Sequence, residues 1–112
     1  MFDALKNLGN IGEMMKQARQ LQDKMKTMQE SLARQQVSAD AGAGMVEATV
    51  NGKLELIKIK IDKSKFDVND TEMLEDLITA AVHAAQVKAA EMSRREMEKA
   101  AGEMGIPPGM LP

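Results

Sequence analysis

A heptad repeat in the first third of the chain constrains its fold most strongly. Apolar residues recur there at spacings of 3 and 4 for a little over three heptads, and the residues between them are polar or charged. This period places the apolar side chains on one stripe of a helix, as at the a and d positions of a coiled coil. The pattern predicts a helix from about Asn10 to Gln36 with a seam that needs cover. The seam consists of Ile11, Met14, Ala18, Leu21, Met25, Met28 and Leu32.

The middle of the chain changes to a period of two, which is typical of β-strands. Apolar and polar residues alternate over 37–41 and 46–50, and a third segment covers 53–62. Gly42-Ala43-Gly44 separates the first two segments, and Asn51-Gly52 separates the last two. Asn-Gly is a strong hairpin signal because both residues tolerate the positive φ of a type I′ turn. We therefore expect a three-stranded antiparallel meander.

A two-residue loop at Asn51-Gly52 would set the register of the last two strands and pair Val46 with Ile57. Leu54 and Leu56 would then fall on the face opposite Ile57, because the apolar alternation changes phase between Leu56 and Ile57. A β-bulge can restore the phase. Otherwise the sheet is apolar on both faces near the hairpin tip, and these two leucines are candidates for a dimer interface.

A second long helix is predicted after a connection over 63–69. Acidic residues at its start are stabilised by the positive N-terminal end of the helix macrodipole. An apolar stripe then runs along the helix to Met92. The helix is expected to end near Ala101. Residues 102–112 contain three Gly and three Pro, so we expect a disordered tail after a single domain over 1–101.

The two predicted helices are too long for a compact domain of this size. They measure roughly 40 and 45 Å at 1.5 Å per residue, whereas a compact chain of 112 residues has a radius of gyration near 13–14 Å. They must pack along each other, project as arms or meet another chain. Together with the two-sided sheet, this favours an α+β homodimer with an α-β-β-β-α protomer and two long projecting helices.

Several chemistries are excluded by residues that the chain lacks. It has no Cys, Trp or Tyr, two Phe and one His. Disulfides, Cys-based zinc sites and base stacking on aromatic side chains are therefore excluded. His83 is interpreted as a solvated surface residue, because no nucleophile, base and orienting group can be assembled around it. We expect a protein that is not an enzyme, with no metal, cofactor or small-molecule substrate.

The chain also shows no targeting signal. The first 36 residues lack the apolar core and small-residue cleavage site of a signal peptide, and no apolar run approaches 18 residues. We expect a cytoplasmic protein that has no membrane partner.

Charge is distributed unevenly along the chain. The total is 15 basic and 17 acidic residues, a net charge of −2, which is unlike the basic excess of most isolated DNA-binding domains. Residues 1–36 carry six basic and four acidic groups, and the remainder carries nine and thirteen. The basic residues of the first helix lie off the seam. They form either a solvated coiled-coil face or a set of phosphate contacts on a projecting arm.

Short motifs follow one another in a characteristic order over most of the chain. They are Met14-Met15-Lys16-Gln17-Ala18, Leu21-Gln22, Lys24-Met25, Gly44, Val50-Asn51-Gly52, Ile59-Lys60-Ile61-Asp62, Met73-Leu74-Glu75-Asp76-Leu77-Ile78, Ala80-Ala81-Val82 and Ala84. In this order and spacing the chain resembles the YbaB/EbfC family of bacterial nucleoid-associated proteins. His83 departs from the pattern, since Asn is common there.

The resemblance implies a homodimer whose sheets form the body and whose long helices project like tweezers. It also implies duplex DNA as the partner, bound in the nucleoid with little sequence preference. The basic residues that it carries over as candidate DNA contacts are Lys16, Arg19, Lys24, Lys26, Arg94 and Arg95. The alternative function is a protein-interaction module that acts through its Met-rich helices and tail without direct DNA binding.

Overall fold

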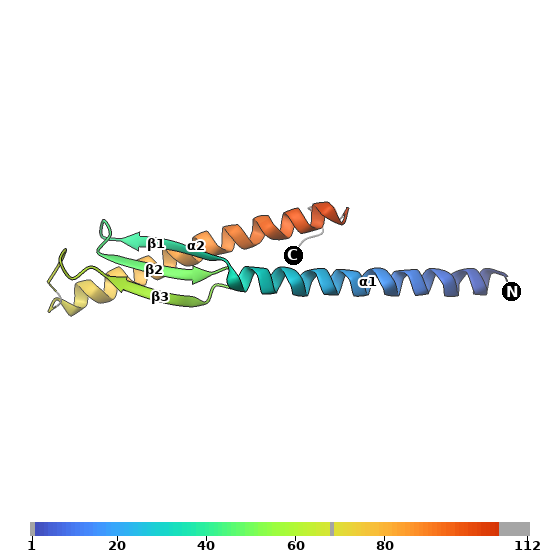
Figure 1. The fold of residues 1–112 in the computed structure, drawn as a ribbon, viewed down its shortest axis with the longest axis horizontal. Coiled ribbons are helices and arrows are strands. Elements are labelled where there is room, and N and C mark those ends of the chain that lie inside the picture. The colour runs from blue at the N-terminus through green and yellow to red at the C-terminus, as the bar shows by residue number, and fades with distance from the viewer. Residues whose placement is uncertain (1, 68, 106–112) are drawn as a thin grey trace.

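The computed structural model describes residues 2–67 and 69–105, with side chains from residue 9 onward. Its elements follow the predicted α-β-β-β-α order, and the strands form an antiparallel sheet in the order β1-β2-β3. The α+β meander is therefore confirmed (Figure 1). The elements are α1 (Phe2–Arg34), β1 (Gln36–Ala41), β2 (Val46–Asn51), β3 (Leu56–Ile61) and α2 (Thr71–Glu103).

Neither helix has its predicted bounds. α1 ends at Arg34, two residues before the predicted end at Gln36, which begins β1 instead. The backbone of α1 is helical from Phe2, eight residues before the predicted start at Asn10, because the helix continues past the first residue of the apolar seam. α2 begins after Asp70, whose side chain accepts a hydrogen bond from the Met73 amide at 3.2 Å. It ends two residues after Ala101, so part of the predicted tail is helical. The predicted disorder of residues 106–112 concerns a segment outside the described residues.

The core lies between α2 and one face of the sheet. Val46, Ala48 and Val50 of β2 pack against Ala81, Ala85 and Ala89 of α2, and all six residues are completely buried. Alanine on the helix lets its backbone approach the strands closely, while valine fills the space from the sheet side. The other face of the sheet is polar along β1 and β2, where the hydroxyls of Ser38 and Thr49 are 2.8 Å apart.

The predicted hairpin register is wrong. Val46 pairs with Ile61 rather than Ile57, a displacement of four residues, because the loop is longer than Asn51-Gly52. The Asn51 amide donates to the Glu55 carbonyl at 3.0 Å, which closes the longer loop. Thr49 pairs with Lys58 but Val50 pairs with Leu56, so Ile57 is an extra residue in β3. The β-bulge alternative is thus confirmed, and it lies at the predicted phase change.

Asn51 and Gly52 hold the end of α1 against the sheet instead of forming a tight turn. The Gly52 amide donates to the Leu32 carbonyl at 2.8 Å, and the Asn51 side chain donates to the Ala33 carbonyl at 3.2 Å. Two of the carbonyls that a helix leaves unpaired at its C-terminus are satisfied in this way. A Cβ atom at Gly52 would lie 2.7 Å from the Leu32 carbonyl oxygen, so this close contact requires glycine.

The molecule is elongated, with principal extents of 80 × 22 × 20 Å and a radius of gyration of 21.8 Å. Both helices leave the same end of the sheet, and α1 extends well beyond the end of α2 (Figure 1). The predicted projecting helices are confirmed, whereas the homodimer stays a prediction. Over residues 2–67 and 69–105, no helix is long and apolar enough to cross a membrane.

Candidate nucleic-acid interface

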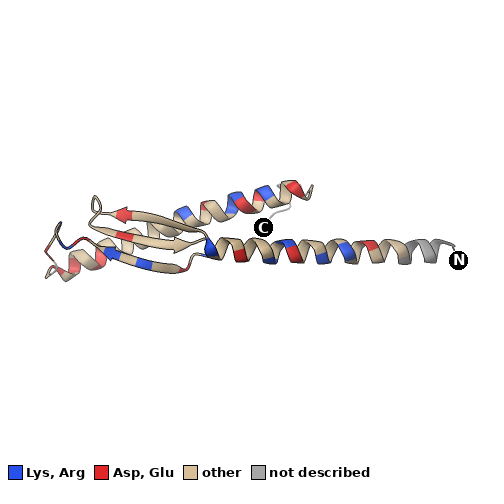
Figure 2. Cartoon of the chain, in the orientation of Figure 1, with Lys and Arg blue, Asp and Glu red and all other residues tan. Residues whose placement is uncertain are grey.

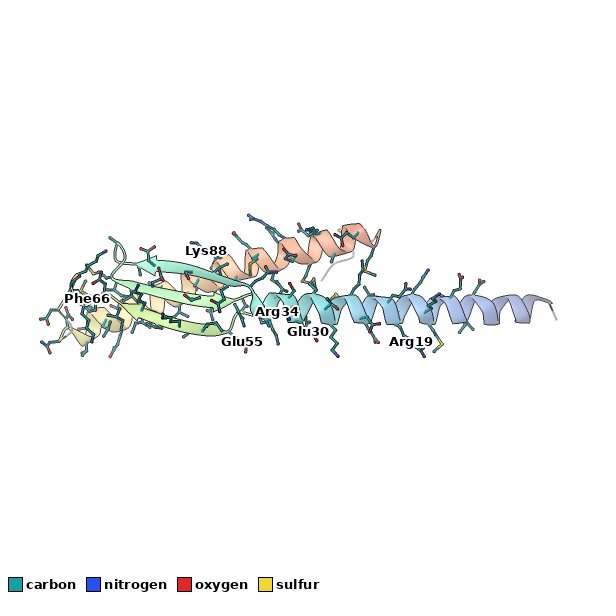
Figure 3. All side chains as sticks on the ribbon, in the orientation of Figure 1. Arg19, Glu30, Arg34, Glu55, Phe66 and Lys88 are labelled. Carbon is teal, nitrogen blue, oxygen red and sulfur yellow. The ribbon has the colours of Figure 1, made fainter. Side chains whose placement is uncertain are left out.

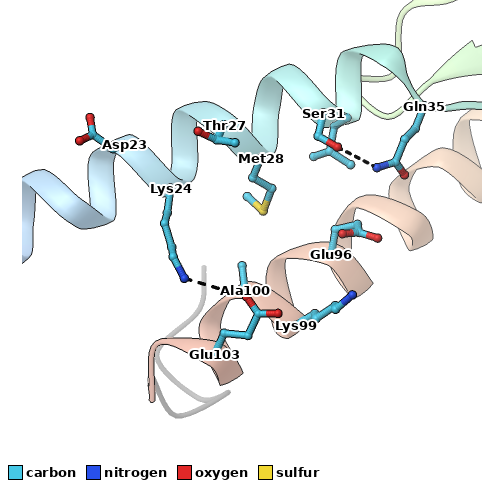
Figure 4. Close-up of a pocket in the computed structure, with 11 residues that line it drawn as sticks. Asp23, Lys24, Thr27, Met28, Ser31, Gln35, Glu96, Lys99, Ala100 and Glu103 are labelled. Carbon is cyan, nitrogen blue, oxygen red and sulfur yellow. Dashed lines mark hydrogen bonds and ion pairs between the residues drawn. The ribbon is translucent and has the colours of Figure 1, made fainter.

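The two projecting helices enclose an open groove that carries charges of both signs. Lys24 Nζ of α1 lies 4.0 Å from Glu103 Oε2 of α2, and this ion pair links the two arms (Figure 4). Asp23, Glu96 and Lys99 also line the groove, which has a volume of about 370 Å³. Because acidic and basic groups alternate here, the groove is not a uniformly positive channel for a phosphate backbone.

Three basic residues of α1 form a stripe on one side of the helix. At 100° per residue, Lys16, Arg19 and Lys26 fall within about 80° of one another, and all three are exposed. Arg19 points to the side of α1 away from α2 (Figure 3). We call these three residues the α1 basic stripe. Lys24 lies at least about 80° from each of them and faces the groove instead.

The basic residues of α2 divide between two directions. Arg94 and Arg95 project about 100° apart because they are adjacent on a helix. Arg94 Nε lies 4.0 Å from Glu98 Oε1 on the exposed surface. Arg95 is in line with Lys88 and Lys99, within about 40°, and we call these three the α2 basic stripe. Lys88 Nζ donates to the Ser38 carbonyl at 3.0 Å, which ties this stripe to the edge of the sheet.

The six predicted contact residues therefore do not form one patch. The structure brings Lys16, Arg19 and Lys26 together, places Arg95 in a second stripe, and pairs Lys24 and Arg94 with acidic neighbours. Figure 2 shows the same alternation, with blue and red turns along both arms and acidic residues at the start of α2. Which of these groups contact DNA stays a prediction.

A lysine-rich segment around β3 was missed in the sequence interpretation. Residues 53–65 contain five Lys and two acidic residues, and a charge count over a window of this length would have found it. Lys58 and Lys60 lie opposite Thr49 and Glu47 in the sheet register. Lysine on an edge strand also discourages unwanted strand pairing, so the segment has a structural explanation without a ligand.

The connection after β3 is held by Asp62. The hydroxyl and amide of Ser64 donate hydrogen bonds to this carboxylate and, with the nearby Lys65 and Lys60, hold the pKa of Asp62 below its ordinary value. The structure places the side chain of His83 on the exposed side of α2, as predicted. Among the described residues, no three potential metal ligands gather at one place.

An exposed apolar patch lies where β3 begins. Leu54, Leu56 and Ile57 are 43–49% exposed, although they belong to the most apolar part of the strand segment. Leu54 also borders a groove of about 300 Å³ with Met25, Met28, Leu32 and Met97. The two leucines predicted at a dimer interface are thus accessible, and the interface itself stays a prediction.

The fold and its surface define a class of protein: a small elongated α+β protein with two charged helical arms. The chain belongs to the YbaB/EbfC DNA-binding family, whose model matches residues 7–104. It is 50% identical over 105 residues to "Nucleoid-associated protein amb4104" of Paramagnetospirillum magneticum, covering 94% of this chain and 95% of the relative.

Another relative and a solved structure are similar over most of their length. A "Nucleoid-associated protein" of Syntrophobacter fumaroxidans is 48% identical over 98 residues, covering 88% of this chain and 89% of the relative. The crystal structure of the uncharacterized protein HP0035 from Helicobacter pylori has a TM-score of 0.65 at 20% identity, covering 76% of this chain and 88% of that one. At that identity the solved structure shows the fold alone.

Proposed function

We propose that this protein binds duplex DNA in the cytoplasmic nucleoid, mainly through phosphate contacts and with little sequence preference. The family match over residues 7–104 is the observation that carries the proposal. Two relatives of about 50% and 48% identity are named nucleoid-associated proteins, which supports the same location. The proposed role is binding rather than catalysis.

The exposed basic groups of the arms are the proposed contacts. The α1 basic stripe is exposed along its length and projects at least about 80° away from Lys24, which pairs with Glu103 in the inter-arm groove. Lys24, Arg94 and Arg95 complete the proposed set. Because lysine and arginine on an exposed helix face neutralise phosphates without reading base edges, this arrangement favours low sequence specificity.

The proposed binding unit is a homodimer built around Leu54 and Leu56. β3 is an edge strand, and Leu56 at its start and Leu54 in the loop before it are 49% and 43% exposed. Exposed apolar side chains that lie together are typical of a protein–protein contact. A dimer would present two pairs of arms and would double the number of phosphate contacts.

A salt series tests the DNA proposal. For B-DNA, log Kobs is expected to fall linearly with log salt with a slope of about −0.9 for each phosphate neutralised. Random and defined duplexes of equal length should give similar affinities and slopes, measured by fluorescence anisotropy. The absence of binding at micromolar protein and low salt would contradict the proposal.

The Met-lined groove supports protein binding as the second candidate. Met25, Met28 and Met97 gather in the open space beside Leu54, and methionine adapts readily to different apolar partners. A stoichiometric protein partner that survives nuclease treatment during purification would favour this function over direct DNA binding.

A further inference from the structure

The α1 arm is joined to the sheet by a single residue. α1 ends at Arg34 and β1 begins at Gln36, so only Gln35 lies between the arm and the body. Farther out, the two arms are linked by the Lys24–Glu103 ion pair, whose side chains are both more than half exposed. Exposed ion pairs contribute little to stability, and an open groove separates the arms. The direction of α1 is therefore fixed mainly where the helix joins the sheet.

Asn51 is buried against this end of α1, and its side chain uses its full hydrogen-bonding capacity. Within residues 9–67 and 69–105 it is the only buried residue with a polar side chain, at 3% exposure. Its Oδ1 atom accepts from the amides of Lys53 at 2.9 Å and Glu55 at 3.0 Å. Its Nδ2 atom donates to the Ala33 carbonyl at 3.2 Å and to Glu55 Oε1 at 3.1 Å. A side-chain amide has two donor hydrogens and two acceptor lone pairs, so all of them are paired.

These bonds fix the last turn of α1 relative to the loop between β2 and β3. The Oδ1 atom of Asn51 holds the loop, whereas the Nδ2 atom holds the helix. Gln35 is also tied back to α1, because its amide donates to the Ser31 carbonyl at 3.1 Å and its side chain donates to the Ser31 hydroxyl at 3.1 Å (Figure 4). The connecting residue is therefore not a free hinge while Asn51 holds the last turn.

We infer that Asn51 is a positioning residue for DNA binding: through Ala33 it sets the direction of α1, and hence where the α1 basic stripe lies relative to α2. Lys16 lies 16 residues before Leu32, which is about 24 Å of helix. A tilt of about 20°, the size of a helix kink, would move Lys16 by about 8 Å. Successive phosphates of one DNA strand are about 3.4 Å apart along the axis, so this tilt changes which phosphates the two arms reach together. The consequence for DNA rests on the proposed function, whereas the arm geometry does not.

Asn51→Asp separates the two halves of this network. The carboxylate keeps the shape of the side chain and still accepts from the loop amides, but it has no proton to donate. An oxygen in place of Nδ2 would lie 3.2 Å from the Ala33 carbonyl oxygen and 3.1 Å from Glu55 Oε1. Because these oxygens would face one another without a hydrogen between them, the last turn of α1 should be released while the core between α2 and the sheet remains.

Distances between spin labels on the two arms test the positioning role without DNA. The chain has no cysteine, so Glu13→Cys on α1 and Ala90→Cys on α2 provide labelling sites at exposed positions. In the Asn51→Asp background this distance should shift or broaden by about 5–10 Å for a tilt of about 20°. The pair Glu47→Cys with Ala90→Cys reports on the sheet and α2 alone, and its distance should stay the same. Dilution with unlabelled protein keeps each measured distance within one chain.

The DNA affinity of the same variant tests the consequence. Asn51→Asp should lower the affinity several-fold, although every residue of both basic stripes is still present. Gln29→Glu is the charge-matched control, since it adds the same negative charge at an exposed position on α1, three residues from Lys26. A purely electrostatic effect would be at least as large in Gln29→Glu, whereas positioning predicts the larger loss in Asn51→Asp.

The remaining outcomes overturn the inference or replace the variant. An unchanged distance between the arms in Asn51→Asp would overturn the positioning role. An affinity that stays unchanged while the distance changes, or an equal loss in Gln29→Glu, would overturn its role in DNA binding. If circular dichroism shows that Asn51→Asp is unfolded, Asn51→Ser replaces it, since this variant adds no charge and shortens the side chain, and the same change in distance is expected. Absence of DNA binding by the unmodified protein would contradict the proposed function instead, and the distances would still decide whether Asn51 sets the direction of α1.

Discussion

At the scale of single residues, Asn51 and Gly52 determine how the projecting α1 is attached. The sequence identified this pair as a turn signal, and the structure uses it for a contact with a helix far away in the sequence. A local pattern of turn residues does not reveal such a contact, because it depends on where α1 ends in space. The predicted register failed for that reason, although the bulge beside Ile57 was anticipated from the change in apolar phase.

Gly52→Ala is predicted to destabilise the protein by about 1–3 kcal/mol, the usual range for overpacking. The new methyl group would lie 2.7 Å from the Leu32 carbonyl oxygen and must displace backbone atoms. Urea unfolding followed by circular dichroism measures the free energy of unfolding. Gly12→Ala is the matched control, since its Cβ meets nothing within 4 Å. This control should be neutral or up to about 1 kcal/mol stabilising. Equal effects at both positions would contradict the assigned contact.

At the scale of elements, apolar periodicity predicted each helix and strand, but not their ends. The heptad marks where α1 needs cover, whereas helical backbone extends beyond the seam. The candidate contact residues were predicted one by one from charge and family resemblance. The two stripes and the Arg94–Glu98 pair follow from the angular positions of the residues around each helix. The Lys24–Glu103 pair depends on how α2 lies against α1, which a list of charged residues does not reveal.

Neutralising the α1 basic stripe should weaken DNA binding more than neutralising the paired lysine. Arg19→Gln with Lys26→Gln removes two exposed charges and should reduce the steepness of the salt dependence by about 1.8, at 0.9 per phosphate. Lys24→Gln should change it by less than half as much, because Lys24 lies near Glu103 and faces the groove. Anisotropy titrations at several salt concentrations give the slopes. A larger effect at Lys24 would place the DNA in the inter-arm groove.

The packing of α2 on the sheet makes a separate prediction. Ala85→Leu inserts a large side chain where the residue is completely buried against β2, and it should cost about 1–3 kcal/mol. Ala90→Leu is a matched control on the exposed side of the same helix and should change stability by less than about 0.5 kcal/mol. Thermal unfolding compares the two. A neutral Ala85→Leu would contradict close packing of helix and sheet.

At the scale of the whole molecule, helix length was the most informative quantity in the sequence. Two helices longer than a compact domain predicted projection, and the 80 Å extent confirms it. The apolar pattern of the sequence does not identify the partner that covers the remaining apolar surface. An exposed leucine has the same sequence signature whether a second copy or another protein covers it. Leu54, Leu56 and the exposed residues of the α1 seam all pose that question.

Disruption of the β3 edge should separate the proposed homodimer into protomers. Leu56→Glu places a charge in the exposed apolar patch, and burying an unpaired carboxylate in an interface is strongly unfavourable. Light scattering at micromolar concentration should show about twice the protomer mass of 12.2 kDa for the unmodified protein and a single protomer for the variant. Val87→Glu is the control, because Val87 on α2 is 47% exposed and Leu56 is 49% exposed. This control should stay dimeric.

A dimeric Leu56→Glu variant would move the interface away from β3, and a monomeric unmodified protein would contradict the homodimer. A DNA-binding protein with one pair of arms would then remain, with half the phosphate contacts and a correspondingly shallower salt dependence.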